Sequence, residues 1–456
     1  MNSLWFRTAL LPDGWAHGVS LEVRQGRITG VRAGTTPEVD DECHAVAIPG
    51  LANVHSHAFQ RAMAGLAEVS GPAGDDFWSW REIMYSFVDR LGPEDVEAIA
   101  AWAFVEMLES GFTRVAEFHY LHHAPDGSPY TQLAELAIRV AAAAAETGIG
   151  LTLLPVLYSY GNFGGAAAGG AQRRFMNDSE RFARLLAASR EAVRPLEGAV
   201  VGVAPHSLRA VAPPDLDQVA QLAGEGPVHI HIAEQMREVN DCLAWSGRRP
   251  VEWLLDHAAV DSRWCLVHAT HMSPAETRAL AESGAVAGLC PVTEANLGDG
   301  IFPADDYLAA DGTFGLGSDS NIHIDASAEL CALEYSQRLT RQRRNVLAGA
   351  PGRSSGRRLF DAALLGGGQA AGFPSAGLAP GSPADFLSLD AEHPALVGRS
   401  GDALLDSWIF AGGKSVIDCV WRAGHKVVAG SCHVRRERIA KRYREVMRRL
   451  LFTMPD

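Results

Sequence analysis

The segment "LANVHSHAFQRA", residues 51–62, decides how this chain is interpreted. An apolar run ends in two histidines, His55 and His57, and polar residues follow at once. Side chains two residues apart on a strand point to the same face, about 7 Å apart along it. The segment therefore predicts a buried strand whose end carries paired imidazoles, close enough to bind one metal ion.

Further apolar runs follow, and helical stretches separate them. Near-continuous apolar strands between helices indicate a parallel sheet that is buried on both faces. Eight such units close a (β/α)₈ TIM barrel, so we predict this α/β fold for residues 49–377. The apolar runs lie at residues 46–55, 114–120, 150–158, 200–207, 228–235, 264–271, 285–291 and 313–320. The helical stretches lie at 93–110, 131–147, 179–193, 215–224 and 274–283.

Both ends of the chain have the pattern of short strands. The stretch "VSLEVRQGRITGVRAG" (19–34) alternates apolar and polar residues around a Gln-Gly turn, which is typical of a hairpin. We predict that residues 1–48 and 378–432 pair into one small β-sandwich domain. Residues 433–456 are expected to contain a C-terminal helix. Its basic face indicates a solvated surface helix or, as the alternative, a membrane or partner contact.

Composition argues against several classes of protein. The chain has 456 residues and a net charge of −14, which disfavours nonspecific binding to nucleic acid. No apolar run is long enough to span a bilayer, and the N-terminus lacks the pattern of a signal peptide. Its seven cysteines are scattered, as is typical of reduced thiols. We expect a cytoplasmic enzyme that binds neither nucleic acid nor membranes.

Chemically reactive residues end several of the predicted barrel strands. Active sites of such barrels form at the carboxyl ends of the strands. His231 ends the fifth strand, His268 ends the sixth, and Asp319 ends the eighth. Together with His55 and His57, they predict a site for a divalent metal.

Other histidines offer alternatives to this site. His229 shares a face with His231 but lies one pleat deeper, so we interpret it as a packed barrel histidine. A second metal at His119, His122 and His123 stays open.

The lysines restrict which kind of metal site is possible. The chain has only three, Lys414, Lys426 and Lys441, so the predicted barrel has none for a carboxylated metal bridge. The whole pattern resembles the amidohydrolase superfamily, whose two-metal members use such a lysine after strand four. Here that strand ends in "APHSLR" (204–209), which favours the one-metal deaminases.

That resemblance implies roles for the residues at the strand ends. The deaminases carry a His-x-x-Glu motif, which His231 and Glu234 match. Their histidine on strand six and aspartate on strand eight are matched by His268 and Asp319. The implied ion is zinc, one per subunit, or iron. The implied metal ligands are His55, His57, His231 and Asp319.

Longer stretches are similar to the formimidoylglutamate deiminase family of bacterial histidine degradation. They are "NVHSHAFQRAMAGLAE" (53–68), "FWSWREIMY" (77–85), "AEFHYLHH" (116–123), "GVAPHSLRAV" (202–211) and "HIHIAEQ" (229–235). The resemblance implies hydrolysis of N-formimidoyl-L-glutamate to N-formyl-L-glutamate and ammonia, by an enzyme that is commonly a homodimer.

Residue chemistry agrees with this reaction. Asp319 is suited to accept the proton of a water molecule, His268 to hold the hydroxide, and Glu234 to protonate the leaving nitrogen. The substrate is a small dicarboxylate, and arginine is the strongest cation left in the barrel to bind it. By resemblance, the substrate-binding residues are Gln60, Arg81, Tyr120, His206 and Arg209.

Several alternatives remain open at this stage. A deaminase of a heterocyclic amine, such as guanine, an adenosine derivative or an aminotriazine, would keep the same metal ligands. A scaffold protein without catalysis is another class. The Gly/Ala-rich stretch 161–172 is either a flexible lid or an insertion, and Trp78 and Trp80 either line the pocket or pack the loop.

Overall fold

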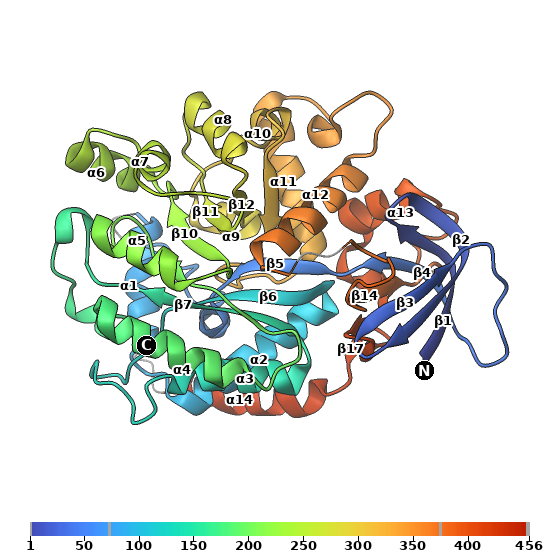
Figure 1. The fold of residues 1–456 in the computed structure, drawn as a ribbon, viewed down its shortest axis with the longest axis horizontal. Helices are drawn as coiled ribbons and strands as arrows, with labels where there is room; N and C mark the ends of the chain where they lie inside the picture. The colour runs from blue at the N-terminus through green and yellow to red at the C-terminus, as the bar shows by residue number, and fades with distance from the viewer. Residues whose placement is uncertain (1, 72–73, 374–375, 453–456) are drawn as a thin grey trace.

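The computed structural model describes residues 2–71, 74–373 and 376–452, which form two sheets and a set of surrounding helices (Figure 1). One sheet is the barrel, on the left of the view, and the other forms the small domain on the right. The predicted α/β architecture, a barrel with a separate β domain built from both chain ends, is confirmed.

The barrel strands pair in parallel and in chain order. The last strand returns to the first through Leu316 and Asn53. Bridges from Val203 to Val228 and from Ser207 to His231 close the other side, so the sheet forms a ring. The strands are β5 (Leu51–Ser56), β6 (Phe112–His119), β7 (Gly150–Leu157), β8 (Val200–Val201), β9 (Ala204–Pro205), β10 (Val228–Ile232), β11 (Trp264–His268), β12 (Val286–Leu289) and β13 (Thr313–Leu316).

The predicted fourth strand is two short strands, β8 and β9, in the structure. The first predicted run, 46–55, is also divided, because it supplies β4 (Glu42–Pro49) to the small sheet and β5 to the barrel. Gly50 makes this change of sheet possible. A Cβ atom there would lie 2.2 Å from Thr113 Cγ2, so no other residue fits without a shift.

Helices cover the outside of the barrel (Figure 1). All five predicted helices are present within a few residues of their expected bounds. Local sequence sets their starts: α2 begins at Pro93, and the Asp95 side chain accepts the N–H of Gly92. The helices are α1 (Phe77–Val88), α2 (Pro93–Glu109), α3 (Glu135–Thr147), α4 (Ser179–Val193), α5 (Pro213–Leu222), α6 (Met236–Ser246), α7 (Pro250–His257), α8 (Pro274–Ser283), α9 (Pro291–Leu297), α10 (Ala304–Ala309), α11 (Ala326–Arg341) and α12 (Ser355–Ala370).

The small domain contains an eight-stranded sheet in the order β17-β16-β15-β14-β4-β1-β2-β3. Phe6 on β1 contacts Trp421 on β15, with ring centroids 6.2 Å apart, although β4 and β14 lie between these strands. The sheet therefore curls around its own core. Besides β4, its strands are β1 (Asn2–Leu11), β2 (Gly14–Arg24), β3 (Arg27–Arg32), β14 (Phe386–Leu389), β15 (Ile417–Arg422), β16 (His425–Ala429) and β17 (Cys432–His433).

The C-terminal helix, α14 (Arg436–Phe452), lies along the outside of the barrel next to α2 (Figure 1). Tyr443 stacks on Trp102 of α2, with centroids 5.6 Å apart. Arg438 pairs with Glu146 at 2.7 Å, and Arg436 pairs with Glu109. Part of its basic face thus contacts acidic groups of the barrel. Among the described helices, none has the length and apolar character needed to cross a membrane.

The Gly/Ala-rich stretch 161–172 is tied to the structure at two points. Phe163 stacks on Trp245 of α6, with centroids 5.4 Å apart. The Gln172 side chain donates a hydrogen bond of 2.6 Å to the hydroxyl of Tyr158. The stretch is therefore anchored to α6 and to the top of the barrel.

Close packing where β13 meets β5 predicts a sensitive position at Gly317. A Cβ atom there would lie 2.7 Å from His55 Cβ and 2.8 Å from the His55 carbonyl oxygen. Gly317→Ala should overpack this junction at a cost of about 1–3 kcal/mol and lower the apparent Tm. Gly170→Ala is the control, because nothing lies within 4 Å of that Cβ position. Equal melting temperatures for the two variants in a thermal unfolding experiment would contradict the packing shown.

Candidate metal centre and active site

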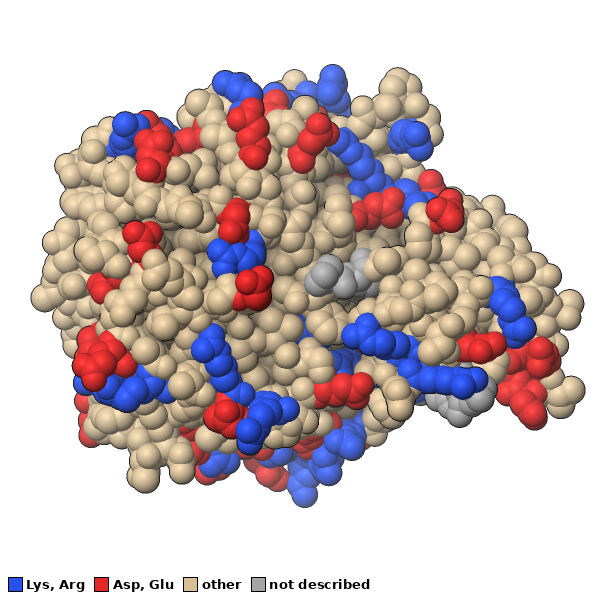
Figure 2. Space-filling view, viewed as in Figure 1, with Lys and Arg blue, Asp and Glu red and all other residues tan. Residues whose placement is uncertain are grey.

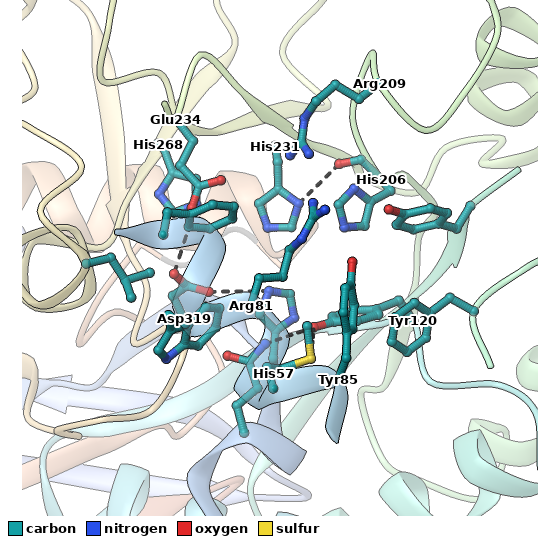
Figure 3. Close-up of a pocket in the computed structure, with 17 residues that line it drawn as sticks. His57, Arg81, Tyr85, Tyr120, His206, Arg209, His231, Glu234, His268 and Asp319 are labelled. Carbon is teal, nitrogen blue, oxygen red and sulfur yellow. Dashed lines mark hydrogen bonds and ion pairs between the residues drawn. The ribbon is translucent and has the colours of Figure 1, made fainter. Parts of the chain in front are cut away.

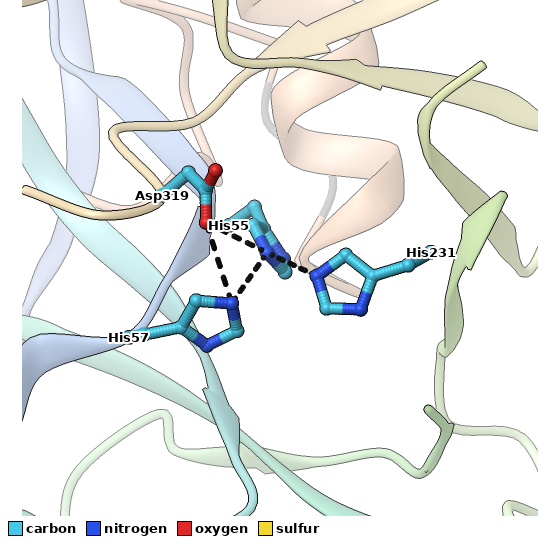
Figure 4. A group of neighbouring side chains, drawn as sticks. All are labelled: His55, His57, His231 and Asp319. Carbon is cyan, nitrogen blue, oxygen red and sulfur yellow. Dashed lines mark hydrogen bonds and ion pairs between the residues drawn. The ribbon is translucent and has the colours of Figure 1, made fainter. Parts of the chain in front are cut away.

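Four side chains from three barrel strands converge at the mouth of the barrel (Figure 4). The Nε2 atom of His55 lies 3.2 Å from His57 Nε2 and 3.0 Å from His231 Nε2. Asp319 Oδ1 lies 3.3 Å from His57 Nε2. The four ligand atoms lie within 4.8 Å of one another, and all four residues are buried. The structure thus brings together the four predicted metal ligands.

The hydrogen-bond partners of the rings show which nitrogen atoms face the centre as acceptors. His57 Nδ1 lies 3.1 Å from the Phe118 carbonyl, and His231 Nδ1 lies 3.1 Å from the His206 carbonyl. A carbonyl only accepts, so each Nδ1 carries the hydrogen and each Nε2 turns a lone pair to the centre. Burial lowers the pKa of His57 to about 3 and that of His231 well below its usual value, so both rings are neutral.

This donor set fits one divalent cation. Four ligands at about 2.0–2.1 Å from a tetrahedral zinc ion stand roughly 3.3 Å from one another. The observed separations of 3.0, 3.2 and 3.3 Å are close to that value. Lone pairs that face each other across such distances repel, and a cation between them removes the repulsion.

Backbone and amide hydrogen bonds hold Asp319 beside the histidines. Its N–H donates to the His55 carbonyl, and its carbonyl accepts from the His57 N–H, both at 2.9 Å. The Asn321 side chain donates to the carbonyls of His57 and Asp319 at 3.1 Å. The Asn53 side chain bonds Ser318 on the other side. Asn53 lies within the predicted first strand and Asn321 directly follows the predicted eighth, but neither was predicted to support the site.

His268 lies between three carboxyl groups next to the metal ligands. Its Nε2 is 3.6 Å from Glu234 and 4.0 Å from Asp319, and its Nδ1 is 3.3 Å from Glu294. Burial alone lowers the pKa of His268, but these three groups raise it to about 10. Burial raises the pKa of Glu234 to about 7, which suits a group that takes up and releases protons at neutral pH. No pattern in the sequence pointed to Glu294.

A cavity with an empty volume of about 530 Å³ opens beside these groups (Figure 3). Glu234, His268 and Asp319 lie on one side in this view, and Tyr85, Tyr120 and His206 lie on the other. Every predicted catalytic and substrate-binding residue lines the cavity: Gln60, Arg81, Tyr120, His206, Arg209, Glu234, His268 and Asp319.

Two arginines reach this cavity without a carboxylate partner. In the described part of the chain, neither Arg81 nor Arg209 lies within ion-pair distance of a carboxylate, and both Nε atoms are buried without a hydrogen-bond acceptor. The more distant charges of Glu238 and Glu234 act on Arg209. Arg81 lies 4.5 Å and Arg209 5.6 Å from the ring centroid of Trp78. Trp78 therefore packs against the arginines, whereas Trp80 lines the cavity.

Three of the other buried histidines, His122, His123 and His229, bond to backbone carbonyls, whereas the buried Nε2 of His119 has no partner among the described residues. His122 Nε2 bonds the Val156 carbonyl and His123 Nε2 the Met176 carbonyl, each at 3.0 Å. Over the described ranges, these two and His119 form no group of converging ligand atoms. His229 Nε2 bonds the Ala370 carbonyl at 2.7 Å, as expected for a packed barrel histidine.

Comparisons with known proteins agree with this geometry. Residues 46–427 match the model of the "Amidohydrolase family", and residues 1–45 match that of "Formimidoylglutamate deiminase HutF, N-terminal domain". A formimidoylglutamate deiminase of Pseudomonas aeruginosa is 51% identical over 99% of this chain and 100% of its own length.

Solved structures share the whole fold. An amidohydrolase from Brucella melitensis has a TM-score of 0.96 and 56% identity, over 99% of this chain and 100% of its own. An adenosine deaminase from Xanthomonas campestris with bound zinc has a TM-score of 0.81 and 22% identity, over 99% and 98% of the two chains, which shows the fold alone. The chain therefore belongs to the amidohydrolase family and, within it, to the formimidoylglutamate deiminases.

Proposed function

We propose that this enzyme hydrolyses N-formimidoyl-L-glutamate to N-formyl-L-glutamate and ammonia, a step of histidine degradation. One observation carries the proposal: a single cavity joins a His₃Asp metal centre to two arginines that form no ion pair with any described residue. The substrate has the matching groups, an amidinium carbon at one end and two carboxylates at the other. The name of the Pseudomonas aeruginosa relative supports the same reaction.

We infer one zinc ion per subunit at His55, His57, His231 and Asp319, with iron as the alternative that the same ligands accept. The zinc in the Xanthomonas campestris structure supports this choice. When bound, such an ion lowers the pKa of a water molecule towards about 7 and makes it a nucleophile.

The protons of the reaction are handled by the chain's own side chains. Asp319 accepts a proton from the attacking water, while His268, 4.0 Å from Asp319 Oδ2, orients that water. Glu234, 3.6 Å from His268, delivers a proton to the departing nitrogen. An amidinium and water give an amide and ammonium, so these transfers need no net proton from solvent.

Substrate orientation follows from the unpaired groups around the cavity. The guanidinium groups of Arg81 and Arg209 bind the two carboxylates, because planar forks of N–H donors match carboxylate oxygens. Gln60 donates to the Tyr120 hydroxyl at 2.8 Å, and its buried Oε1 has no partner among the described residues. That oxygen is suited to accept an N–H of the amidinium, and His206 lines the same wall.

The remaining expectations concern location and partners. We propose a cytoplasmic homodimer that binds neither nucleic acid nor membranes. Figure 2 supports this in part: acidic and basic side chains interleave across the face shown, and no broad basic field covers it.

The direct test is ammonia release from N-formimidoyl-L-glutamate. We expect turnover of this compound and little or none of N-formimidoyl-aspartate, guanine or adenosine. A chelator should remove the activity, and added zinc should restore it. Failure of the metal-loaded enzyme to release ammonia from N-formimidoyl-L-glutamate would overturn the proposed function.

The carboxylate-binding role of Arg209 predicts a selective loss of substrate affinity. Arg209→Met keeps an apolar stem but removes a charge-assisted bidentate contact, so we expect KM to rise by at least about tenfold, the equivalent of about 1.4 kcal/mol. Arg184→Met is the control, because Arg184 is exposed and, among the described residues, pairs with Glu180 on its own helix. Steady-state kinetics that leave KM unchanged in Arg209→Met would favour a heterocyclic amine as substrate instead.

The proton-delivery role of Glu234 predicts a loss in kcat without a loss of metal. Glu234→Gln keeps the size of the side chain but cannot transfer a proton, so kcat should fall on the order of 10²–10⁴-fold. The metal content should stay at the wild-type level, since Glu234 is not among the four ligands. Exposed Glu282 provides the control Glu282→Gln. A kcat within a factor of three of wild type would rule out this role.

A further inference from the structure

The short link between the metal ligand His231 and Glu234 contains an unfavourable backbone conformation. Ala233 has φ = +51°, in the left-handed region that the Cβ atom of an L-residue disfavours. Such a residue keeps this conformation only where its surroundings impose it. The position of the Glu234 side chain depends on this bend, because Ala233 immediately precedes Glu234.

The buried carboxylate of Glu238 holds the two N–H groups of the bend, and the Ala233 carbonyl accepts the N–H of His271 at 3.0 Å. Glu238 lies in the first turn of α6 and is 1% exposed. Its Oε1 accepts the N–H of Ala233, and its Oε2 accepts the N–H of Glu234, both at 3.2 Å. One planar group thus fixes two consecutive peptide units. No solvent reaches the side chain to replace these bonds if they are lost.

The same carboxylate also acts on the substrate side of the cavity. Burial lowers the pKa of Arg209, but the charges of Glu238 and Glu234 oppose this and raise it overall. Arg209 itself is 6% exposed. Glu238 therefore acts on both Glu234, which moves the proton, and Arg209, which binds a carboxylate. Glu238 itself does not line the cavity.

We propose that Glu238 is a positioning residue that holds Glu234 at the reacting nitrogen by fixing the left-handed backbone at Ala233. This inference rests on the proposed function. An acidic residue at a helix N-terminus ordinarily stabilises the helix and has no effect on catalysis. The proposed role of Glu238 differs, because it acts on the position of Glu234.

The first test is Glu238→Gln. The amide has one acceptor oxygen in place of two, so one of the two N–H groups loses its partner and the bend relaxes. We expect kcat to fall at least tenfold with metal content retained. KM should stay level or decrease, because the variant removes a negative charge near Arg209 and leaves the cation in place. A higher KM at unchanged kcat would overturn the inference.

The second test is rescue by glycine at position 233. Glycine adopts φ = +51° without a Cβ penalty, so Ala233→Gly in the Glu238→Gln background should recover a several-fold share of the lost kcat. Ala233→Gly alone is the reference for the double variant. If Glu238 acts only through its charge, glycine restores nothing, and that result would refute backbone positioning.

A matched control separates positioning from general stability. Glu276 is also a buried first-turn glutamate, on α8, and it accepts the N–H groups of Ser273 and Glu252. Glu276→Gln should lower the Tm as Glu238→Gln does but keep the wild-type kcat. Equal losses of kcat in both would reduce Glu238 to a stability role. The turnover of the wild-type enzyme in the same assay tests the proposed function. The kcat of each variant relative to wild type tests the role of Glu238 separately.

Discussion

The structure depends on holding four electron-pair donors together in a buried space. Three imidazoles and a carboxylate, from the ends of β5, β10 and β13, place their ligand atoms within 4.8 Å. Without a cation this arrangement is repulsive, so the fold must impose it. The closed barrel does so, because parallel strands end at one rim, and reciprocal backbone bonds between His55, His57 and Asp319 lock two of those ends.

The same rim uses unusual backbone conformations to aim its side chains. Ala233, His268, Asp319 and Asn321 all have positive φ, although none is glycine. The first two directly follow or end a barrel strand, and the other two lie in the loop after β13. A left-handed residue turns the chain sharply and lets a side chain face the barrel axis instead of the next layer. Buried amides and carboxylates, such as Asn321 and Glu238, supply the hydrogen bonds that maintain these turns.

Sequence reasoning predicted the barrel, the small domain and a metal site at the strand ends, because strand periodicity and strand ends are local features. The choice of four ligands, with His268 left out, came from the resemblance to the deaminases. Sequence reasoning placed the domain boundary between residues 48 and 49 but treated the run 46–55 as one strand, since the close approach of Gly50 to Thr113 at the change of sheet is not a local feature of the sequence. It also missed the groups that support the site. Glu238 and Glu294 have the spacing of ordinary helix residues, and their roles follow only from which backbone or ring atoms they meet across the fold.

The positions of the lysine and arginine side chains affect both the metal centre and the choice of substrate. A barrel without lysine has no residue to form a carboxylated bridge to a second ion, which agrees with the single metal proposed above, and its rim carries carboxyl groups of its own. Glu234, Asp319 and Glu294 around His268 would repel an anionic substrate. Arg81 and Arg209, which form no ion pair within the described ranges, oppose that repulsion across the same cavity. A neutral heterocycle would leave the buried Arg209 and the half-buried Arg81 without an anionic partner, which supports the proposed dicarboxylate substrate.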